Sequence, residues 1–228
     1  MKARPPLDSL PEWLQRHILH FEAQIEAELA SFGSQCGPLD RVLDAGAGEC
    51  QYASFFRNTR YTAVDLGIGD TSWSYTELDV LSDLLFLPFR DNTFDAALNV
   101  VTLEHVTDPA QVVQELFRCL KPGGRLLLIT PMEWEEHQQP HDYFRYTQFG
   151  LEHLTRSAGF VDIRIEAVGG FFRLLARRLM NSVQFFPGIL AILPVIAFGP
   201  LALTLPFLDT LDKKRSFTLG HICFARKP

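Results

Sequence analysis

The chain has 228 residues, 47% hydrophobic and 21% charged, which is the composition of a globular protein with one α/β domain and a modest extension. Its net charge of −6 is uneven, because residues 171–228 hold eight Lys and Arg and two Asp and Glu, whereas residues 1–170 hold 13 and 25. An acidic body argues against nucleic-acid binding, and four scattered cysteines without a CxxC spacing argue against a disulfide framework or a zinc site. The first residues lack an apolar h-region, so we expect no secretory signal and a cytoplasmic location.

Residues 9–32 are predicted to form a helix within an N-terminal extension of residues 1–36. The letters "SLPE" have the spacing of a capping box from Ser9 to Glu12, and apolar residues then recur every three or four positions. These apolar residues are Leu14, Ile18, Phe21, Ile25 and Leu29. The segment "GSQCGP" (33–38) ends the helix.

Residues 37–170 alternate between β-rich runs and helical patterns. Asp108 and Thr147 are the expected N-caps of two helices, and a shorter helix is expected in "CQYASFFRN". Runs with strand character occupy 41–45, 61–65, 75–79, 94–101, 125–130, 161–168 and 219–226. This alternation predicts an α/β fold with a doubly wound parallel sheet, in which the last run pairs near 161–168 as an antiparallel edge strand.

The first strand runs into "VLDAGAGECQY" (42–52), where Gly-x-Gly precedes a helical pattern. Glycine permits a sharp turn, and the exposed amides with the following helix start can cradle a polar ligand. A dinucleotide fingerprint would place a third glycine where this chain has Gln51. On spacing alone, a ligand-binding loop and a plain tight turn remain equal alternatives.

Polar residues end the neighbouring strands. Asp65 ends the second strand, where a carboxylate can accept two hydrogen bonds from a ribose diol, and Asp79 with Val80 ends the third, where an adenine edge can be read. With Asp44 and Asn99, these residues should converge at the carboxyl edge of the sheet, where ligands bind in such folds. The alternatives are that Asp65 is a turn residue and that Asp79 caps a helix.

Motifs within residues 40–170 resemble those of the class I S-adenosylmethionine-dependent methyltransferases. "LPF" (87–89), "FD" (94–95), "LEHV" (103–106) and "LKPGG" (120–124) follow the glycine loop in the order of a broad subgroup of that family. The set is specific for the fold and the cofactor but not for the acceptor. It implies a Rossmann-like, mostly parallel seven-stranded sheet with an apolar helical insertion before a final strand in 217–228.

The resemblance also implies roles for individual residues. The Gly46–Gly48 loop would carry the methionine part of S-adenosylmethionine, Asp65 the ribose, Asp79 and Val80 the adenine, and Asn99 would lie beside the sulfonium. The full set expected to bind the cofactor is Asp44, Ala45, Gly46, Gly48, Asp65, Leu66, Asp79, Val80 and Asn99. Family loops often have glycine where this chain has Cys50, whose Cβ is tolerable if its φ is negative.

Candidate acceptor residues follow the fifth strand, in "EEHQQPHDYFRYTQFG" (135–150). His141 beside a carboxylate is a candidate base, with His105 as a second, and Arg145 can bind an anionic group. The residues expected to contact the acceptor are Glu104, Asp142, Tyr143, Arg145 and Tyr146. Alternatively, Glu104 and His105 brace their loop, His141 and Asp142 structure the turn before the Thr147-capped helix, and Arg145 pairs with an acidic loop residue. Methyl transfer requires no metal, and none is expected here.

Residues 171–216 form an expected insertion whose centre, 179–208, carries no charge. Its length permits a membrane span, but four prolines argue against one straight helix. The insertion lies between two strands of one sheet, so it must return to the side from which it left. Basic residues flank it at Arg173, Arg177, Arg178 and 213–215, as in a hairpin at an anionic membrane surface. A lid over the acceptor site or a dimer interface is the alternative.

Three hypotheses follow for function. The first is a methyltransferase acting on a small, hydrophobic or lipid-linked acceptor, peripheral on the inner face of a membrane. The second is the same enzyme acting on a soluble acceptor, with 179–208 as lid or subunit interface. The third is a cofactor-binding scaffold without turnover. The oligomeric state does not follow from the sequence.

Overall fold

The computed structural model describes residues 11–70 and 72–228, so Ser9 of the expected capping box lies outside the described residues. The described chain divides into two compact units. One unit contains the chain up to Ile25 together with Ala167–Gly220, and the other contains Glu26–Glu166 and His221–Pro228.

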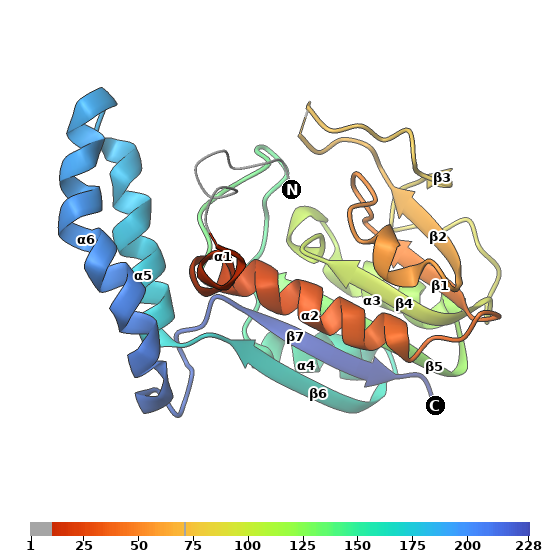
Figure 1. Cartoon of the computed structure of the whole chain (residues 1–228). Helices are drawn as coiled ribbons and strands as arrows, with labels where there is room; N and C mark the ends of the chain where they lie inside the picture. Colours follow the sequence, from red (N-terminus) through yellow and green to blue (C-terminus); the bar gives the residue numbers. More distant parts are fainter. Residues whose placement is uncertain (1–10, 71) are drawn as a thin grey trace. The chain divides into compact units, whose positions relative to one another are not determined.

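A sheet of seven strands, in the order β3-β2-β1-β4-β5-β7-β6, organises the larger unit (Figure 1). The strands are β1 Arg41–Ala45, β2 Arg60–Asp65, β3 Val80–Leu81, β4 Phe94–Val100, β5 Leu120–Pro131, β6 Val161–Val168 and β7 Gly220–Arg226. The first five strands pair in parallel, and β1 lies between β2 and β4. The doubly wound, mostly parallel sheet predicted from the sequence is confirmed, and its order reverses between β1 and β4.

The last strand pairs in the opposite direction to β6. The amide of Leu219, just before β7, donates to the Val168 carbonyl at 3.1 Å, whereas Arg226 at the end of β7 pairs with Asp162 near the start of β6. The antiparallel direction was therefore predicted correctly. The expected edge position was wrong, because β7 inserts between β5 and β6 and leaves β6 at the edge.

Two helices of the larger unit begin at the predicted caps. Asp108 accepts from the Gln111 amide at the start of α3 (Pro109–Cys119), and Thr147 accepts from the Gly150 amide at the start of α4 (Gln148–Ser157). The predicted apolar stripe of α3 is buried at Val112, Val113 and Leu116.

Three local predictions differ from the structure. The expected N-terminal helix is broken at Leu19 into α1 (Glu12–Ile18) and α2 (His20–Ser34). The segment after the glycine loop forms only a short 3₁₀ turn, η1 (Ala53–Phe56). The third strand begins at Val80 rather than at residue 75, because the residues before it form turns.

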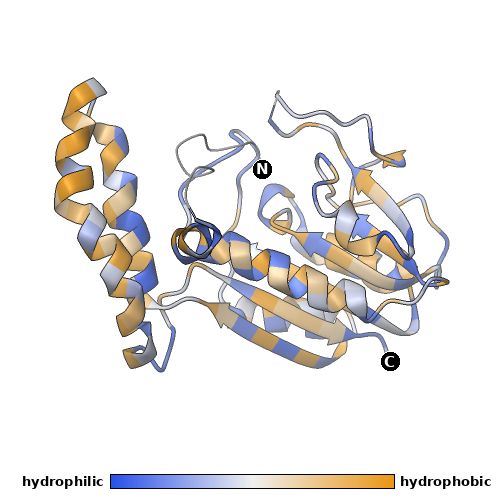
Figure 2. Cartoon of the chain, in the orientation of Figure 1, coloured by the Kyte–Doolittle hydropathy of each residue, from blue (hydrophilic) through white to orange (hydrophobic). Residues whose placement is uncertain are grey.

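Within the other unit, the apolar insertion forms a helical hairpin (Figures 1 and 2). Its elements are α5 Phe171–Asn181, η3 Ser182–Phe185, η4 Gly188–Ala191, α6 Ile192–Thr204 and η5 Leu205–Leu211. Gly188–Leu211 is long and apolar enough to cross a membrane, with a mean hydropathy of 2.2 over its most apolar window. Most of that window is exposed, unlike a core helix.

Candidate cofactor and acceptor site

The carboxyl end of β1 opens into a tight glycine turn. Gly46 has a φ of +91° and Gly48 a φ of +54°, values that favour glycine. The amides of Gly46 and Ala47 both donate to the Val64 carbonyl of β2, at 2.7 and 3.0 Å. A Cβ on Gly46 would overlap the side chain of Thr102. Packing within the chain is therefore enough to require glycine at position 46, before any ligand is considered.

Asp65, at the end of β2, fastens this turn to the next loop. Its Oδ2 accepts the Gly48 amide at 3.0 Å, and its Oδ1 accepts the Gly67 amide at 2.8 Å. A carboxylate offers about four lone-pair positions, so about two remain. Asp65 can therefore brace the loops and still accept hydrogen bonds from a ligand diol.

Two buried polar side chains lie near the carboxyl ends of β1 and β4. Asp44 Oδ2 accepts the Tyr61 hydroxyl at 2.5 Å, and Asn99 Nδ2 donates to the Ala45 carbonyl at 2.7 Å. Within residues 11–70 and 72–228, Asp44 Oδ1 and Asn99 Oδ1 find no hydrogen-bond partner. Burial raises the pKa of Asp44 to about 7, against the opposing effect of the Tyr61 hydroxyl. Buried acceptors without a donor are costly, so a ligand carrying a cation or N–H groups would satisfy them.

The other residues predicted to bind the cofactor surround the same edge of the sheet. Asp79 Oδ2 accepts the Ala63 amide at 2.8 Å and so fastens the entry to β3, where Val80 begins the strand. Leu66 is exposed after β2, and Ala45 is buried at the end of β1. Asp79 keeps its second oxygen for a ligand, so its adenine role is compatible with this bracing contact.

Cys50 departs from the expected geometry. A side chain at this position is tolerable without strain only if φ is negative, but φ is +58°, a left-handed conformation that a non-glycine residue adopts at a cost. The condition is not met because residues 48–52 form consecutive turns rather than the start of a helix. Trp73, which sequence analysis did not select, lies over the loop, and a Cβ on Gly48 would sit 3.3 Å from its ring.

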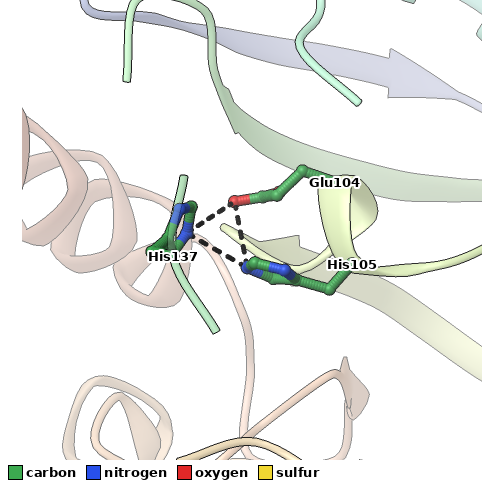
Figure 3. Close-up of side chains that lie close together, drawn as sticks. All are labelled: Glu104, His105 and His137. Carbon is green, nitrogen blue, oxygen red and sulfur yellow. Dashed lines mark hydrogen bonds and ion pairs between the residues drawn. The ribbon is translucent and has the colours of Figure 1, made fainter. Parts of the chain in front are cut away.

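The residues predicted to contact the acceptor begin in η2 (Leu103–His105), the short turn after β4. It places Glu104 in a fully buried position and His105 in a half-buried one. His137, from the segment after β5, joins them: its Nε2 lies 3.1 Å from His105 Nε2 and 3.9 Å from a Glu104 oxygen (Figure 3). His137 was not among the predicted site residues, although it lies in the segment 135–150, four residues before His141.

The electrostatics of these groups follow from burial. Burial raises the pKa of Glu104 to about 8, against the weaker opposing effect of Arg145. Burial also lowers the pKa of His105, although the hydrogen bond to the His141 carbonyl opposes this shift. At neutral pH both groups are therefore largely uncharged.

Asp142 and Arg145 form a bidentate ion pair, with oxygen–nitrogen distances of 2.6 and 2.8 Å. The Arg145 guanidinium lowers the pKa of Asp142 to about 2. Arg145 also donates to the carbonyls of Trp134, Glu135 and Phe144, so its guanidinium is largely committed within the chain. This arrangement matches the bracing alternative for Arg145 and leaves little of it to bind an anionic acceptor.

The remaining predicted acceptor residues separate. Tyr146 is buried and donates its hydroxyl to the Leu103 carbonyl at 2.7 Å. His141 Nδ1 lies 3.1 Å from the Tyr143 hydroxyl, and neither side chain joins the Glu104 cluster. Asp142 is bound to Arg145, so the carboxylate expected to tune His141 is engaged elsewhere.

Comparison with known proteins agrees with this geometry. Residues 43–128 match a family model described as a methyltransferase domain. A probable S-adenosylmethionine-dependent methyltransferase of Mycolicibacterium smegmatis is 30% identical over 125 residues, which are 52% of this chain and 45% of the relative. The ubiquinone/menaquinone biosynthesis C-methyltransferase UbiE of Pasteurella multocida is 34% identical over 101 residues, 44% of this chain and 34% of that protein.

The fold recurs in a solved structure titled the [4+2]-cyclase SpnF, with a TM-score of 0.58, 22% identity and coverage of 90% of this chain and 81% of that one. The chain spans less than half the length of the first curated relatives it matches. The glycine turn, the strand-end carboxylates and the buried acceptors without a partner among the described residues fit S-adenosylmethionine, the cofactor in the name of the Mycolicibacterium smegmatis relative. Residues 43–128 therefore match a methyltransferase domain, and the relatives together with the sheet order support a class I S-adenosylmethionine-dependent methyltransferase.

Proposed function

We propose that this enzyme transfers a methyl group from S-adenosylmethionine to a small hydrophobic or lipid-linked acceptor at a membrane surface. The exposed apolar hairpin of 179–208 is the observation that supports a hydrophobic or lipid-linked acceptor. In a water-soluble enzyme, this apolar surface would have to be buried against another part of the protein or a partner. The resemblance to quinone C-methyltransferases over part of the chain supports a hydrophobic acceptor.

The carboxyl edge of the sheet would hold the cofactor. Asp65 would accept hydrogen bonds from the ribose, and Asp79 with Val80 would contact the adenine. Asp44 and Asn99 would meet the methionine part with the oxygens that have no partner among the described residues. S-adenosylmethionine supplies an activated methyl group on sulfonium, so the protein mainly has to position the acceptor and exclude water.

The acceptor would lie between the glycine turn and the segment 132–147. The new bond would join the methyl carbon to an oxygen, nitrogen or carbon of the acceptor while the carbon–sulfur bond of the sulfonium breaks and leaves a neutral thioether, and the acceptor's proton would have to leave. His105 and His141 are the proposed proton acceptors, with Glu104 and Tyr143 lining the site. Tyr146 and the Asp142–Arg145 pair would brace the segment around the acceptor.

The hairpin would dip into the bilayer and return. Its exposed apolar residues include Phe185, Ile189 and Ile196, with exposures of 77%, 80% and 68%. The apolar segment Gly188–Leu211 has 24 residues, about 36 Å at 1.5 Å per residue, so its length reaches a bilayer's hydrocarbon core of about 30 Å and only the sheet requires it to return. Because β6 and β7 lie side by side in one sheet, the hairpin must enter and leave on the same side.

The foot of the hairpin is polar and fixed, which suits the headgroup region. Arg173 contacts Asp209 at 3.5 Å, and Asp212 accepts the Phe171 amide at 2.9 Å. Arg177 lies 4.0 Å from Glu22, so the arginines of α5 are less available to lipid than their sequence pattern suggested. The exposed cations 213–215 would instead meet anionic headgroups.

Two experiments test the proposal. In flotation with anionic and neutral liposomes, the intact protein should float, and better with anionic lipid, whereas a version with 183–208 replaced by a Gly/Ser linker should not. A Lys213→Gln, Lys214→Gln variant should lose the anionic preference while retaining the apolar hairpin. Failure of the intact protein to float would favour a lid or subunit interface and a soluble acceptor.

Turnover is measured separately, with tritium-labelled S-adenosylmethionine and a total membrane extract. Label should enter the organic phase with the intact protein. Label that enters only water-soluble products would favour the soluble-acceptor hypothesis. Cofactor binding without label transfer to any fraction would favour the scaffold hypothesis.

A further inference from the structure

Three side chains with metal-binding atoms converge beside η2: Glu104, His105 and His137 (Figure 3). The two histidine Nε2 atoms are 3.1 Å apart, and a Glu104 oxygen lies 3.7 Å from His105 Nε2 and 3.9 Å from His137 Nε2. The close-up shows that the carboxylate and both rings point toward a common centre. Glu104 and His105 are neighbours in the sequence, whereas His137 lies 32 residues after His105. The fold therefore creates the cluster, and no local sequence motif reveals it.

The hydrogen bonds of the rings define which nitrogen carries the proton. His105 Nδ1 lies 2.6 Å from the His141 carbonyl, and His137 Nδ1 lies 3.1 Å from the Glu135 carbonyl. A carbonyl oxygen only accepts, so each Nδ1 is the donor, and both Nε2 atoms of the neutral rings present lone pairs. Two facing lone pairs at this distance repel unless a cation lies between them.

Glu104 is the second group at this centre whose polar atoms lack a hydrogen-bond donor within the described part of the chain. Its side chain is fully buried, and neither carboxylate oxygen finds a hydrogen-bond partner among residues 11–70 and 72–228. The nearby guanidinium of Arg145 is bound to Asp142 instead. A buried carboxylate of this kind needs a proton or a positive ligand.

We propose that Glu104, His105 and His137 bind a divalent transition-metal ion, with zinc as the best match. Two nitrogens bound at about 2.0–2.1 Å in a tetrahedron are about 3.3 Å apart, close to the separation of the two rings. The Glu104 oxygen must approach by only a few tenths of an ångström. Two imidazoles and one carboxylate suit zinc and similar ions, whereas calcium and magnesium prefer sites made of oxygen ligands.

Hydrogen bonds around the cluster orient the two proposed histidine ligands. Metal-binding histidines usually donate their other N–H to a carbonyl or carboxylate, as both rings do here. Asp142 accepts the His137 amide at 2.8 Å and is itself held by Arg145, so the segment that carries His137 is fixed.

A bound metal ion would have one consequence for methyl transfer. This consequence rests on the proposed methyltransferase function. Three protein ligands leave a coordination position for water or an acceptor oxygen. His105 would then have its lone pair on the metal, which leaves His141 as the candidate base. Metal binding itself does not depend on the acceptor or on turnover.

The test is metal binding by the full-length protein. After chelator treatment and dialysis, we expect zinc titrated in a calorimeter to bind with a stoichiometry near one, and cobalt(II) to give the visible bands of a site with four or five ligands. His137→Ala and Glu104→Gln should each weaken zinc binding at least tenfold, the usual minimum for losing a ligand or its support. His153→Ala, an exposed histidine on α4, should bind like the wild type.

Circular dichroism of each variant separates lost binding from lost folding. Glu104→Gln preserves the shape of the side chain and so guards against unfolding as the cause. Equal zinc affinity in wild type and folded His137→Ala would overturn the proposal, as would the absence of stoichiometric binding by the wild type. Either result leaves the methyltransferase proposal intact, because its test is label transfer.

Discussion

Glu104→Gln tests whether burial controls the carboxyl group beside η2. Burial raises the pKa of Glu104 from 4.5 to about 8. The unfolded chain ionises near pH 4.5 while the folded chain keeps the proton, so metal-free wild-type protein should lose stability as pH rises between these values. The loss should be about 1.4 kcal/mol per pH unit, and at most about 5 kcal/mol in total, because each unit of pKa shift corresponds to about 1.4 kcal/mol.

Glutamine keeps the size of the side chain and cannot ionise. The variant and wild type should therefore have similar free energies of unfolding near pH 4.5, whereas above pH 8 the variant should be more stable by about 2–5 kcal/mol. The measurement is urea unfolding at pH 5, 6.5 and 8.5 in the presence of a chelator. Glu26→Gln, at an exposed position on α2, is the control and should change little at any pH.

Two results would refute this reasoning. A stability difference that stays constant from pH 5 to 8.5 would mean that Glu104 ionises alike in both states. A variant less stable than wild type at pH 8.5 in chelator would mean that an unrecognised cation pairs with the carboxylate. With saturating zinc the order should reverse, because the charged carboxylate is then stabilised by the ion.

Three further predictions concern the cofactor side. Asp65→Ala should weaken S-adenosylmethionine binding by about 1.5–3 kcal/mol, the range for hydrogen bonds to a charged group, and unchanged calorimetric affinity would contradict its ribose role. Cys50→Gly should raise the free energy of unfolding by up to about 1 kcal/mol, because glycine relieves the left-handed φ of +58°; equal urea midpoints would show that the loop is not strained. Cofactor affinity should fall as pH drops below about 7, where Asp44 becomes protonated, and Tyr61→Phe should move that midpoint upward because the hydroxyl lowers the pKa of Asp44. A flat pH profile of the dissociation constant would remove Asp44 from the methionine site.

The sheet was predictable because its signals are local. Buried strands of the central sheet read as continuous apolar runs, and Asp108 and Thr147 cap their helices through contacts three residues away. The position of β7 depends on pairing between strands far apart in the chain, which periodicity does not encode. The break at Leu19 was also unreadable, because the apolar spacing continues through it.

The candidate site was predictable only in part, for the same reason. Strand-end residues such as Asp65 and Asn99 converge because parallel strands end at one edge. The partner of Arg145 was not predictable from the sequence, because a guanidinium can pair equally well with a nearby acidic residue or with an anionic group of the acceptor. His137 was missed because its partners, Glu104 and His105, are brought to it by the path of the chain after β5.

The Asp142–Arg145 pair determines how the acceptor side responds to pH. Arg145 lowers the pKa of Asp142 to about 2, so the pair stays ionised throughout the range in which Glu104 changes charge. Asp142 also accepts the His137 amide, and the pair therefore fixes the backbone that presents this ring. The pair also acts on Glu104 by charge, because Arg145 lowers and Asp142 raises the pKa of that carboxyl group, so damage to the pair should both displace His137 and shift the pKa of Glu104.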